Sequence, residues 1–555
     1  MKKALMTFLG IGSFLLGLSG GAWALSVASL PRDGQTPQGR AGEALAVKDI
    51  TGDGIPDLII GAPRYGAGDP PGLNQNAYIP GEVSDALSGD VLIFKGTASG
   101  PEATPFITLI GTESSDRFGA AISVGDITGD GKNDLIISAI RASGSDAPRS
   151  GCVYVFRGSD ISIGGTFDAS TAVSHFCGRQ YNELFGHSLA VGQFDGEAGL
   201  DVAVGAPWHS PFQAGMDKAQ ASHKYMAGGV YLISGAEIAA QIAAPTHKIA
   251  AHVSPGDGGA AVYGQYILNL GDLDSTIPSK DELLIFATGA GGHGHRAPGQ
   301  VYLSTWNSAD GFSTPLVVVN GTGQLARYKP AFVGDINGDG FQDIGVSSST
   351  GRGTPSGADT NRAGGIYIIN GNLLGPGIVP YKTVNPDGTI TETTNSLGNV
   401  ALGAVTGAES RDYFGTSISG AGDVNGDGVA DIAVGAPWAN GRVITAIGGT
   451  AINDISGSVY LISGKSIMDA VGDEKFKFKV RGPGPQGFLL EEIAGTSNDR
   501  FGEVLAQGDL TPSVTVDVVV GAPDHDPPTS SNISDVPGTF SNDNRGTAFI
   551  ITTTP

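Results

Sequence analysis

The segment Asp423-Val424-Asn425-Gly426-Asp427-Gly428-Val429-Ala430-Asp431-Ile432-Ala433-Val434-Gly435-Ala436-Pro437 decides the fold, because versions of it recur along the whole chain. Self-similarity at a regular spacing is the signature of a repeat architecture. We therefore expect seven units in one closed body rather than several unrelated domains. The seven loops begin 63 to 88 residues apart, at Asp49, Asp126, Gln193, Asp272, Asp335, Asp423 and Asp509.

Each unit has the same order of elements. A short strand begins near Phe-Gly, as at residues 118–125, and an Asp loop follows it directly. An apolar strand comes next (134–137), then a third strand after a Gly-rich start (229–233), and a fourth strand (106–110) precedes the next Phe-Gly. The strands are short and are bounded by Gly, Pro, Asp and Asn. Seven such four-stranded units predict an all-β, seven-bladed β-propeller.

The third strands give an independent count of the units. The seventh has no fourth strand after it, so we expect the segment 25–30 near the N-terminus to supply that strand and close the ring. The seven third-strand signatures lie at residues 91–94, 153–156, 230–233, 301–303, 366–369, 459–462 and 548–551.

The N-terminus has the pattern of a secretory signal peptide. Lys2 and Lys3 precede a short apolar run at 5–18, and Ala22-Trp23-Ala24 fits a cleavage site. An uncleaved anchor is the alternative, but the run is short for a membrane span. We expect residues 1–24 to be removed and 25–555 to form the propeller, periplasmic, extracellular or at the cell surface, with no transmembrane segment left.

Charge and cysteine usage narrow the function classes. The net charge is −23 and Lys and Arg form no cluster, which argues against a nucleic-acid partner. The chain has two cysteines, Cys152 and Cys177. In an exported protein an even count favours a disulfide, although two buried thiols are the alternative. Their spacing gives no redox or zinc motif.

Four of the loops, the first, second, fifth and sixth, share the pattern D-x-[TN]-G-D-G-x-x-D and predict calcium sites. Ca²⁺ takes six to eight oxygen ligands, and positions one, three, five and nine supply oxygen-bearing side chains. Position seven would offer its backbone carbonyl, and the glycine at position six permits a sharp turn. The candidate ligands are Asp49, Thr51, Asp53, Ile55 and Asp57; Asp126, Thr128, Asp130, Lys132 and Asp134; Asp335, Asn337, Asp339, Phe341 and Asp343; and Asp423, Asn425, Asp427, Val429 and Asp431.

Three other interpretations of these loops compete with calcium. All-oxygen donors argue against zinc and copper. An EF-hand needs a Glu at position twelve and flanking helices, whereas position twelve lies in apolar strands. Metal-free Asp/Gly turns remain the structural alternative. Position twelve is occupied by Ile60, Ile137, Val346 and Val434.

The other three loops depart from the pattern. The third has Gln193, Asp195, Glu197 and Asp201 and lacks the position-six glycine, so weak binding is the most it would support. The fourth runs irregularly from Asp272 and Asp274 to Asp281, and the seventh has Asp509, Thr511, Ser513 and Asp517. We expect the fourth and seventh to be metal-free turns.

The combination of Phe-Gly, Asp loop and Gly-Ala-Pro resembles the FG-GAP repeat family, which includes the propellers of integrin α subunits and of glycosylphosphatidylinositol-specific phospholipase D. The resemblance extends over residues 26–551 and implies a propeller and calcium in the loops. Units one, four and five depart from it. Phe-Gly stands at Phe118, Phe185, Phe414 and Phe501, and Gly-Ala-Pro begins at Gly61, Gly205, Gly435 and Gly521.

No convincing catalytic constellation is present. His293 and His295, and the run Asp524-His525-Asp526, are more simply surface loops. Trp208-His209 and Trp438 follow Gly-Ala-Pro and would pack between blades, or stack on a sugar. Nucleophile-elbow, zinc-protease and phosphate-loop motifs are missing. In the phospholipase the chemistry belongs to a separate zinc domain, which we do not expect here because the repeats begin near residue 26.

We therefore interpret the chain as a non-catalytic, calcium-binding adhesion or binding module, a monomeric propeller whose partner is an extracellular protein or glycan. Function on rigid scaffolds is commonly carried by loops, here the insertions 67–90, 208–228, 351–364 and 438–457. Integrin-type pairing is not expected, because no RGD and no leg domains are seen. The alternative is a hydrolase of lipid-anchor or polysaccharide substrates. A surface-layer or matrix component is the third interpretation.

Overall fold

The structure is a computed structural model, and it describes the parts of the chain in which the seven repeats lie. These are residues 4–5, 16–17, 24–29, 41–63, 88–112, 116–145, 147–209, 228–241, 262–273, 280–287, 299–307, 311–312, 315–321, 329–348, 364–385, 387, 389–407, 412–445, 451–455, 457–470, 478–480, 489–494, 500–510, 516–523 and 547–554.

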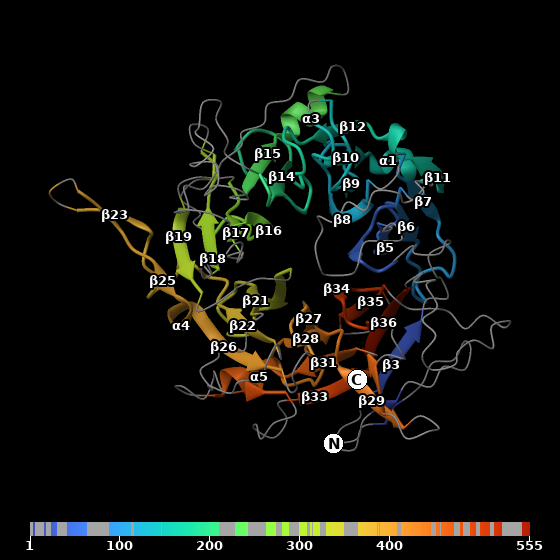
Figure 1. Cartoon of the computed structure of the whole chain (residues 1–555), viewed down its shortest axis with the longest axis vertical. Coiled ribbons are helices and arrows are strands. Elements are labelled where there is room, and N and C mark those ends of the chain that lie inside the picture. Colours follow the sequence, from blue (N-terminus) through green and yellow to red (C-terminus); the bar gives the residue numbers. More distant parts are fainter. Residues whose placement is uncertain are drawn as a thin grey trace.

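Seven β-sheets stand around a central axis, which confirms the predicted seven-bladed propeller (Figure 1). Within each blade the first three strands pair antiparallel in chain order. First strands of neighbouring blades contact one another around most of the ring. The first strands are β4 (Ala44–Lys48), β8 (Phe118–Gly125), β13 (Ser188–Gly192), β16 (Tyr263–Asn269), β20 (Ala331–Gly334), β27 (Ser417–Gly422) and β34 (Val504–Gly508).

The second and third strands form the buried middle of each blade, as their near-continuous apolar sequences predict. The second strands are β5 (Asp57–Ala62), β9 (Asp134–Ala139), β14 (Asp201–Ala206), β17 (Leu283–Ala287), β21 (Asp343–Ser348), β28 (Asp431–Ala436) and β35 (Asp517–Ala522). The third strands are β6 (Asp90–Phe94), β10 (Cys152–Phe156), β15 (Gly229–Ile233), β18 (Gln300–Ser304), β22 (Gly365–Ile369), β31 (Ser458–Ile462) and β36 (Thr547–Thr554).

Fourth strands form the outer layer, and the N-terminal strand completes the ring. β3 (Ala24–Ser29) pairs antiparallel with β36, from Ala24 opposite Thr554 to Ser29 opposite Phe549. The predicted closure is thus confirmed. The third blade's expected fourth strand falls in 242–261, outside the described residues. The other fourth strands are β7 (Ile107–Ile110), β12 (Ser174–Cys177), β19 (Pro315–Asn320), β26 (Ala401–Thr406) and β33 (Leu489–Ala494).

Short parallel strands cover the outer edges of several blades, which the sequence did not predict. β11 (Gly165–Asp168) comes from the second blade and pairs with β7 of the first. β25 (Asn395–Ser396) and β32 (Phe478–Lys479) cover β19 and β26 in the same way. Near the N-terminus, β1 (Ala4–Leu5) pairs with β33, and β2 (Leu16–Gly17) pairs antiparallel with β3. Covered edges offer fewer unpaired backbone groups to other chains.

Two hairpins stand apart from the blades, and helices are short. The hairpin of β23 (Lys382–Val384) and β24 (Ile390–Glu392) projects from the ring (Figure 1). A second, β29 (Asn440–Thr445) with β30 (Ala451–Ile455), occupies the insertion 438–457. No helix of the described residues is long and apolar enough to cross a membrane. The helices are α1 (Gly158–Ile161), α3 (Gly235–Gln241), α4 (Leu397–Val400) and α5 (Gly464–Met468), with the 3-10 turn η1 (Ala169–Thr171).

The Phe-Gly and Gly-Ala-Pro motifs meet across the junctions between blades. A Cβ placed on Gly61 would lie 2.3 Å from the carbonyl oxygen of Gly119 in the next blade, and one on Gly521 would lie 2.1 Å from that of Gly42. Only glycine tolerates such a close backbone approach. The same contact therefore joins the first blade to the second and the seventh to the first.

Where Phe-Gly is present, its phenylalanine anchors the first strand in the core. Phe118 and Phe185 are fully buried and meet the third-strand tyrosines Tyr154 and Tyr231 edge to face, with ring centroids 5.7 and 5.2 Å apart. Edge-to-face pairs add to the energy of apolar burial. In the fourth blade Tyr263 takes this place, which explains why its Tyr-Gly still supports a blade.

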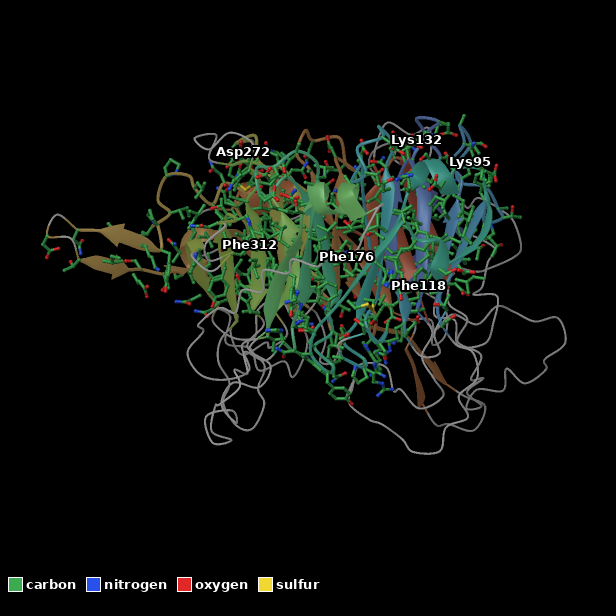
Figure 2. The ribbon with its side chains drawn as sticks, turned by 90° about the horizontal axis from the view of Figure 1, so that it is seen from above. Lys95, Phe118, Lys132, Phe176, Asp272 and Phe312 are labelled. Carbon is green, nitrogen blue, oxygen red and sulfur yellow. A yellow bond between two sulfur atoms is a disulfide. The ribbon has the colours of Figure 1, made fainter. Side chains whose placement is uncertain are left out.

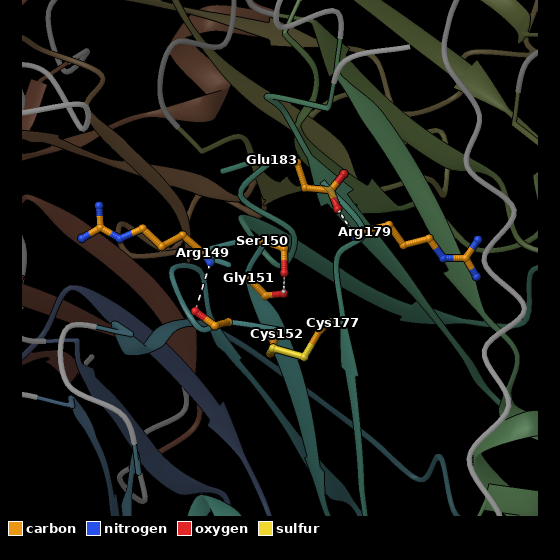
Figure 3. The surroundings of a disulfide bond; sticks show 8 residues. Arg149, Ser150, Gly151, Cys152, Cys177, Arg179 and Glu183 are labelled. Atoms are coloured by element: carbon orange, nitrogen blue, oxygen red, sulfur yellow. Dashed lines mark hydrogen bonds between the residues drawn. A yellow bond between two sulfur atoms is a disulfide. The ribbon is translucent and has the colours of Figure 1, made fainter. Parts of the chain in front are cut away.

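The predicted disulfide joins Cys152 of β10 to Cys177 of β12 (Figure 3). The two residues lie directly opposite each other in the antiparallel pair. The bond therefore fastens the outer strand of the second blade to its neighbour. By the chain-entropy account such a loop contributes about 3 kcal/mol.

Candidate metal-binding loops

The Asp loops connect the first and second strands of their blades, and they gather at one face of the ring. Figure 2 shows Lys132 of the second loop and Asp272 of the fourth at this face, with Phe118 lying toward the other. Within each complete loop, position one is half-buried, position five is exposed and position nine is buried. The carboxylates therefore run from solvent into the blade.

The aspartate at position nine is held by backbone amides. Asp134 is 0% exposed, and its Oδ2 accepts hydrogen bonds from Ile127 N (2.9 Å) and Thr128 N (2.7 Å). Its Oδ1 accepts from Gly158 N at 2.9 Å, two residues after the third strand. The same three contacts surround Asp57. This carboxylate therefore ties the loop to the end of the third strand, which lies beside the start of the second strand.

The glycine that donates to this carboxylate was missed by the sequence analysis. A Cβ on Gly158 would lie 2.0 Å from the carbonyl oxygen of Asn133, so no other residue fits. Gly96, Gly235, Gly371 and Gly464 make the equivalent close approach in their blades. A usable signal was present, because each of these glycines stands two residues after an apolar third strand.

The third and seventh loops, which depart from the full pattern and are called decayed loops here, keep this arrangement. Asp201 of the third loop accepts from Phe194 N (2.9 Å), Asp195 N (3.0 Å) and Gly235 N (2.8 Å). In the seventh loop, Leu510 N donates to Asp517 Oδ2 at 2.8 Å. The position-nine acid is thus a structural residue of the blade, whatever else it binds.

The fourth loop requires a correction. We expected Asp281 to end it, but the buried acid before β17 is Glu282, whose Oε2 accepts Leu273 N. Asp281 turns instead to the third blade and accepts Gln193 N at 2.9 Å. The signal was available, because every position-nine acid directly precedes an apolar strand and Glu282 precedes Leu283.

Positions one and five shape the complete loops. In the second loop Asp126 accepts from Asp130 N (3.0 Å) and Gly131 N (2.9 Å), and Asp130 Oδ1 accepts from Lys132 N (3.0 Å). The first, fifth and sixth loops repeat these turns. The position-six glycines have φ between 84° and 90°, as the predicted sharp turn requires.

Two threonine hydroxyls support a cation in these loops. Thr51 Oγ1 and Thr128 Oγ1, both at position three, are buried and make no hydrogen bond. Each hydroxyl still lies near a loop carboxylate. Burial raises the pKa of Asp134 and the Thr128 hydroxyl opposes that rise, whereas the Ile55 amide, with a smaller contribution from Thr51, lowers the pKa of Asp53. A buried oxygen without a donor is costly, and a cation would satisfy it. The third loop has one such atom, Gln193 Oε1, but the Gln193 amide donates to Glu197 O within the loop.

The carboxylates themselves form no complete cage. Within the described residues, no three His, Cys, Asp or Glu side chains stand together closely enough to hold a metal ion. Burial raises the pKa of Asp343 to about 6 and that of Asp431 to about 7, against the lowering effect of their amide donors. A bound cation would offset this cost of burial. The donor set fits Ca²⁺ once hydroxyl, amide and carbonyl oxygens are counted with the acids.

The structure also describes His209 and Trp438, the candidates that follow Gly-Ala-Pro. His209 is buried, and its Nδ1 lies 2.6 Å from Glu183 Oε2, which also accepts Tyr231 Oη at 2.7 Å. Trp438 lies against Tyr413 and against Arg500, which begins the next blade. Trp438 thus packs between blades as predicted, whereas His209 packs within its own blade. The histidines at 293 and 295 and the run 524–526 lie outside the described residues.

Comparison with known proteins agrees with this architecture. The sequence model of the FG-GAP repeat family matches residues 41–78, 118–156 and 414–461. The chain is therefore a seven-bladed β-propeller that carries FG-GAP repeats.

Relatives of two kinds are similar to parts of the chain. It is 36% identical to phosphatidylinositol-glycan-specific phospholipase D of Rattus norvegicus over 125 residues, 22% of this chain and 13% of that protein. It is 34% identical over 169 residues to integrin alpha-PS2 of Drosophila melanogaster and to integrin alpha-5 of Xenopus laevis, 30% of this chain. These stretches cover 11% and 14% of the two integrins. The chain thus spans only a small part of each relative.

Proposed function

We propose that the chain is an exported, calcium-stabilised propeller that serves as a binding or adhesion module for an extracellular protein or glycan. The observation that carries the calcium part is the buried hydroxyl of Thr51 and of Thr128, which faces loop carboxylates without a hydrogen bond. Calcium in the first, second, fifth and sixth loops would offset the negative charge of the loop carboxylates. Positions one, three, five and nine and the position-seven carbonyl would hold it.

Export rests on the N-terminal signal pattern, and the fold is compatible with cleavage after Ala24. Residues 25–29 of β3, which lie beyond that point, carry most of the pairing with β36. Cleavage would remove β1 and β2 and leave the ring closed. Mass determination of the protein recovered outside the cytoplasm tests this, since an intact N-terminus would contradict it.

The binding role rests on architecture alone. The second strands end and the third strands begin at the face opposite the Asp loops, so the chain leaves and re-enters the blades there. Calcium would brace one face, and recognition would belong to the other. We propose that the partner recognised there is a glycan or an extracellular protein.

The alternative is hydrolysis of a glycosylphosphatidylinositol or polysaccharide substrate, suggested by the name of the rat relative. Purified protein should be tested against immobilised glycan and extracellular-protein arrays and against phosphodiester and glycan substrates. Saturable binding without turnover supports the module. Turnover that is lost on a single acid or histidine substitution would overturn it in favour of an enzyme.

A further inference from the structure

The first and second loops share the pattern D-x-T-G-D-G-x-x-D but differ in what touches position five. In both loops the Oδ1 atom of this aspartate accepts a backbone amide, from Ile55 in the first and Lys132 in the second. Its Oδ2 atom is therefore the oxygen left for a cation. The contacts made by Oδ2 decide how readily the loop takes one.

In the first loop this oxygen already faces a positive charge. Lys95 Nζ lies 3.1 Å from Asp53 Oδ2, and both side chains are about one third exposed, at 31% and 30%. The same ammonium stands 5.5 Å from the centroid of the Phe106 ring. Lys95 directly follows β6, so the blade itself places it. Carboxylate and aromatic ring together hold the ammonium over the loop.

A second lysine reaches the first loop from the next blade. A Cβ on Gly52 would lie 3.6 Å from Lys132 Cε and 3.9 Å from its Nζ. Figure 2 shows both Lys95 and Lys132 at the loop face. The first loop is thus bordered by two ammonium groups.

In the part of the chain that the structure describes, position five of the other complete loops pairs with no such charge. The second blade does place a cation, Arg157, where the first has Lys95, but its guanidinium pairs with Asp160 at 3.9 Å and not with Asp130. In the second loop the neutral Ser159 hydroxyl donates to Asp130 Oδ2 at 2.7 Å. In the fifth, the Asn337 amide contacts Asp339 Oδ2 at 3.2 Å. In the sixth, the residue equivalent to Lys95 is Ser463, which caps α5. Among the described residues, no Lys or Arg pairs with a carboxylate of these three loops.

We propose that Lys95 is a built-in counter-ion that makes the first loop a weaker calcium site than the second, fifth and sixth. The inference rests on the proposed calcium binding. Calcium entering the first loop must displace the ammonium from Asp53 Oδ2 or bind beside it, and like charges repel. The first loop is then the last to fill, and it remains partly neutralised when calcium is low.

Lys95→Met tests this, because methionine keeps an apolar contact with Phe106 and removes the charge. Lys382→Met is the matched control, since Lys382 pairs with Glu392 at 3.8 Å on the β23–β24 hairpin that projects from the ring, away from the loops. Calcium binding is measured by isothermal titration calorimetry and by equilibrium dialysis with radioactive calcium. We expect three tight sites and one weaker site in the unaltered protein and in the control. In Lys95→Met the weak site should tighten roughly tenfold.

A second variant identifies which loop is weak. Asp53→Asn should abolish the weak class and leave three tight sites. If it removes a tight site, or if Lys95→Met binds calcium like the unaltered protein, the role of Lys95 is wrong while calcium binding stands. If the unaltered protein binds no calcium, the proposed function itself fails.

Discussion

The second and third loops belong to neighbouring blades, and their comparison separates structure from metal binding. Asp134 and Asp201 are both buried and accept three backbone amides in the same places. The second loop adds Asp126, Thr128 and Asp130, whereas the third has Gln193, Asp195 and Glu197. The acid at position nine thus builds the blade, and the remaining oxygens are what a calcium site adds.

The largest expected effect comes from removing the shared acid. Asp201→Ala leaves three buried amides without an acceptor, which costs about 3 kcal/mol or more. Asp134→Ala should cost a similar amount in chelator and more in calcium, because it also loses a ligand. Urea denaturation with EDTA and with calcium measures both. If Asp201→Ala proves harmless, position nine is not structural; if either alanine variant fails to fold, the asparagine variants take its place.

Position five should behave differently in the two kinds of loop. Asp427→Ala in the sixth loop should lose one calcium equivalent and about 2 to 3 kcal/mol of calcium-dependent stability at saturating metal. Glu197→Ala, the matched change in the third loop, should leave the response to calcium unaltered. Thermal unfolding with calcium and with EDTA measures the difference. Equal responses of the two variants would remove the distinction between complete and decayed loops.

The buried hydroxyl offers a sharper contrast. Thr128→Val keeps the shape and removes the oxygen, so calcium affinity of the second loop should fall about tenfold, while stability in EDTA changes by less than about 1 kcal/mol. Calorimetric titration and urea unfolding give the two quantities. A large loss of stability in EDTA would mean that the hydroxyl serves the fold and not the metal.

The smallest effect concerns pH in the third loop. Burial raises the pKa of Asp201 to about 6 from its ordinary value of 3.8. The folded state then binds a proton more tightly than the unfolded state, so this residue favours folding increasingly as pH falls from 7 toward 4. Between pH 7 and pH 5 the protein should gain on the order of 1 kcal/mol relative to Asp201→Asn. Urea midpoints in EDTA measure this, and a constant difference would contradict the raised pKa.

Much of the architecture was predictable because its determinants are local. Phe-Gly, Gly-Ala-Pro and the apolar third strands recur in order, and the segment before Leu30 had the length and composition of a missing strand. The disulfide followed from an even cysteine count, and its position opposite in a strand pair confirms it.

Other features depend on contacts that the sequence does not display. The edge strands β11, β25 and β32 are two to four residues long, and no hydrophobic alternation marks them. In the sequence nothing distinguishes Lys95 from other surface lysines, because its contact with Asp53 forms only when β6 and the first loop pack together. Glu282 was missed because the pattern asks for an aspartate and Asp281 is adjacent, although neither keeps the spacing from Asp272 and Glu282 is the acid that directly precedes the apolar strand.

Calcium stoichiometry of the purified protein tests the central claim most directly. After dialysis against saturating calcium, elemental analysis and calorimetry should give four calcium ions per chain, from the first, second, fifth and sixth loops. Chelation should lower the melting temperature, and added calcium should restore it. Protein that holds no calcium and melts identically with and without EDTA would contradict the account.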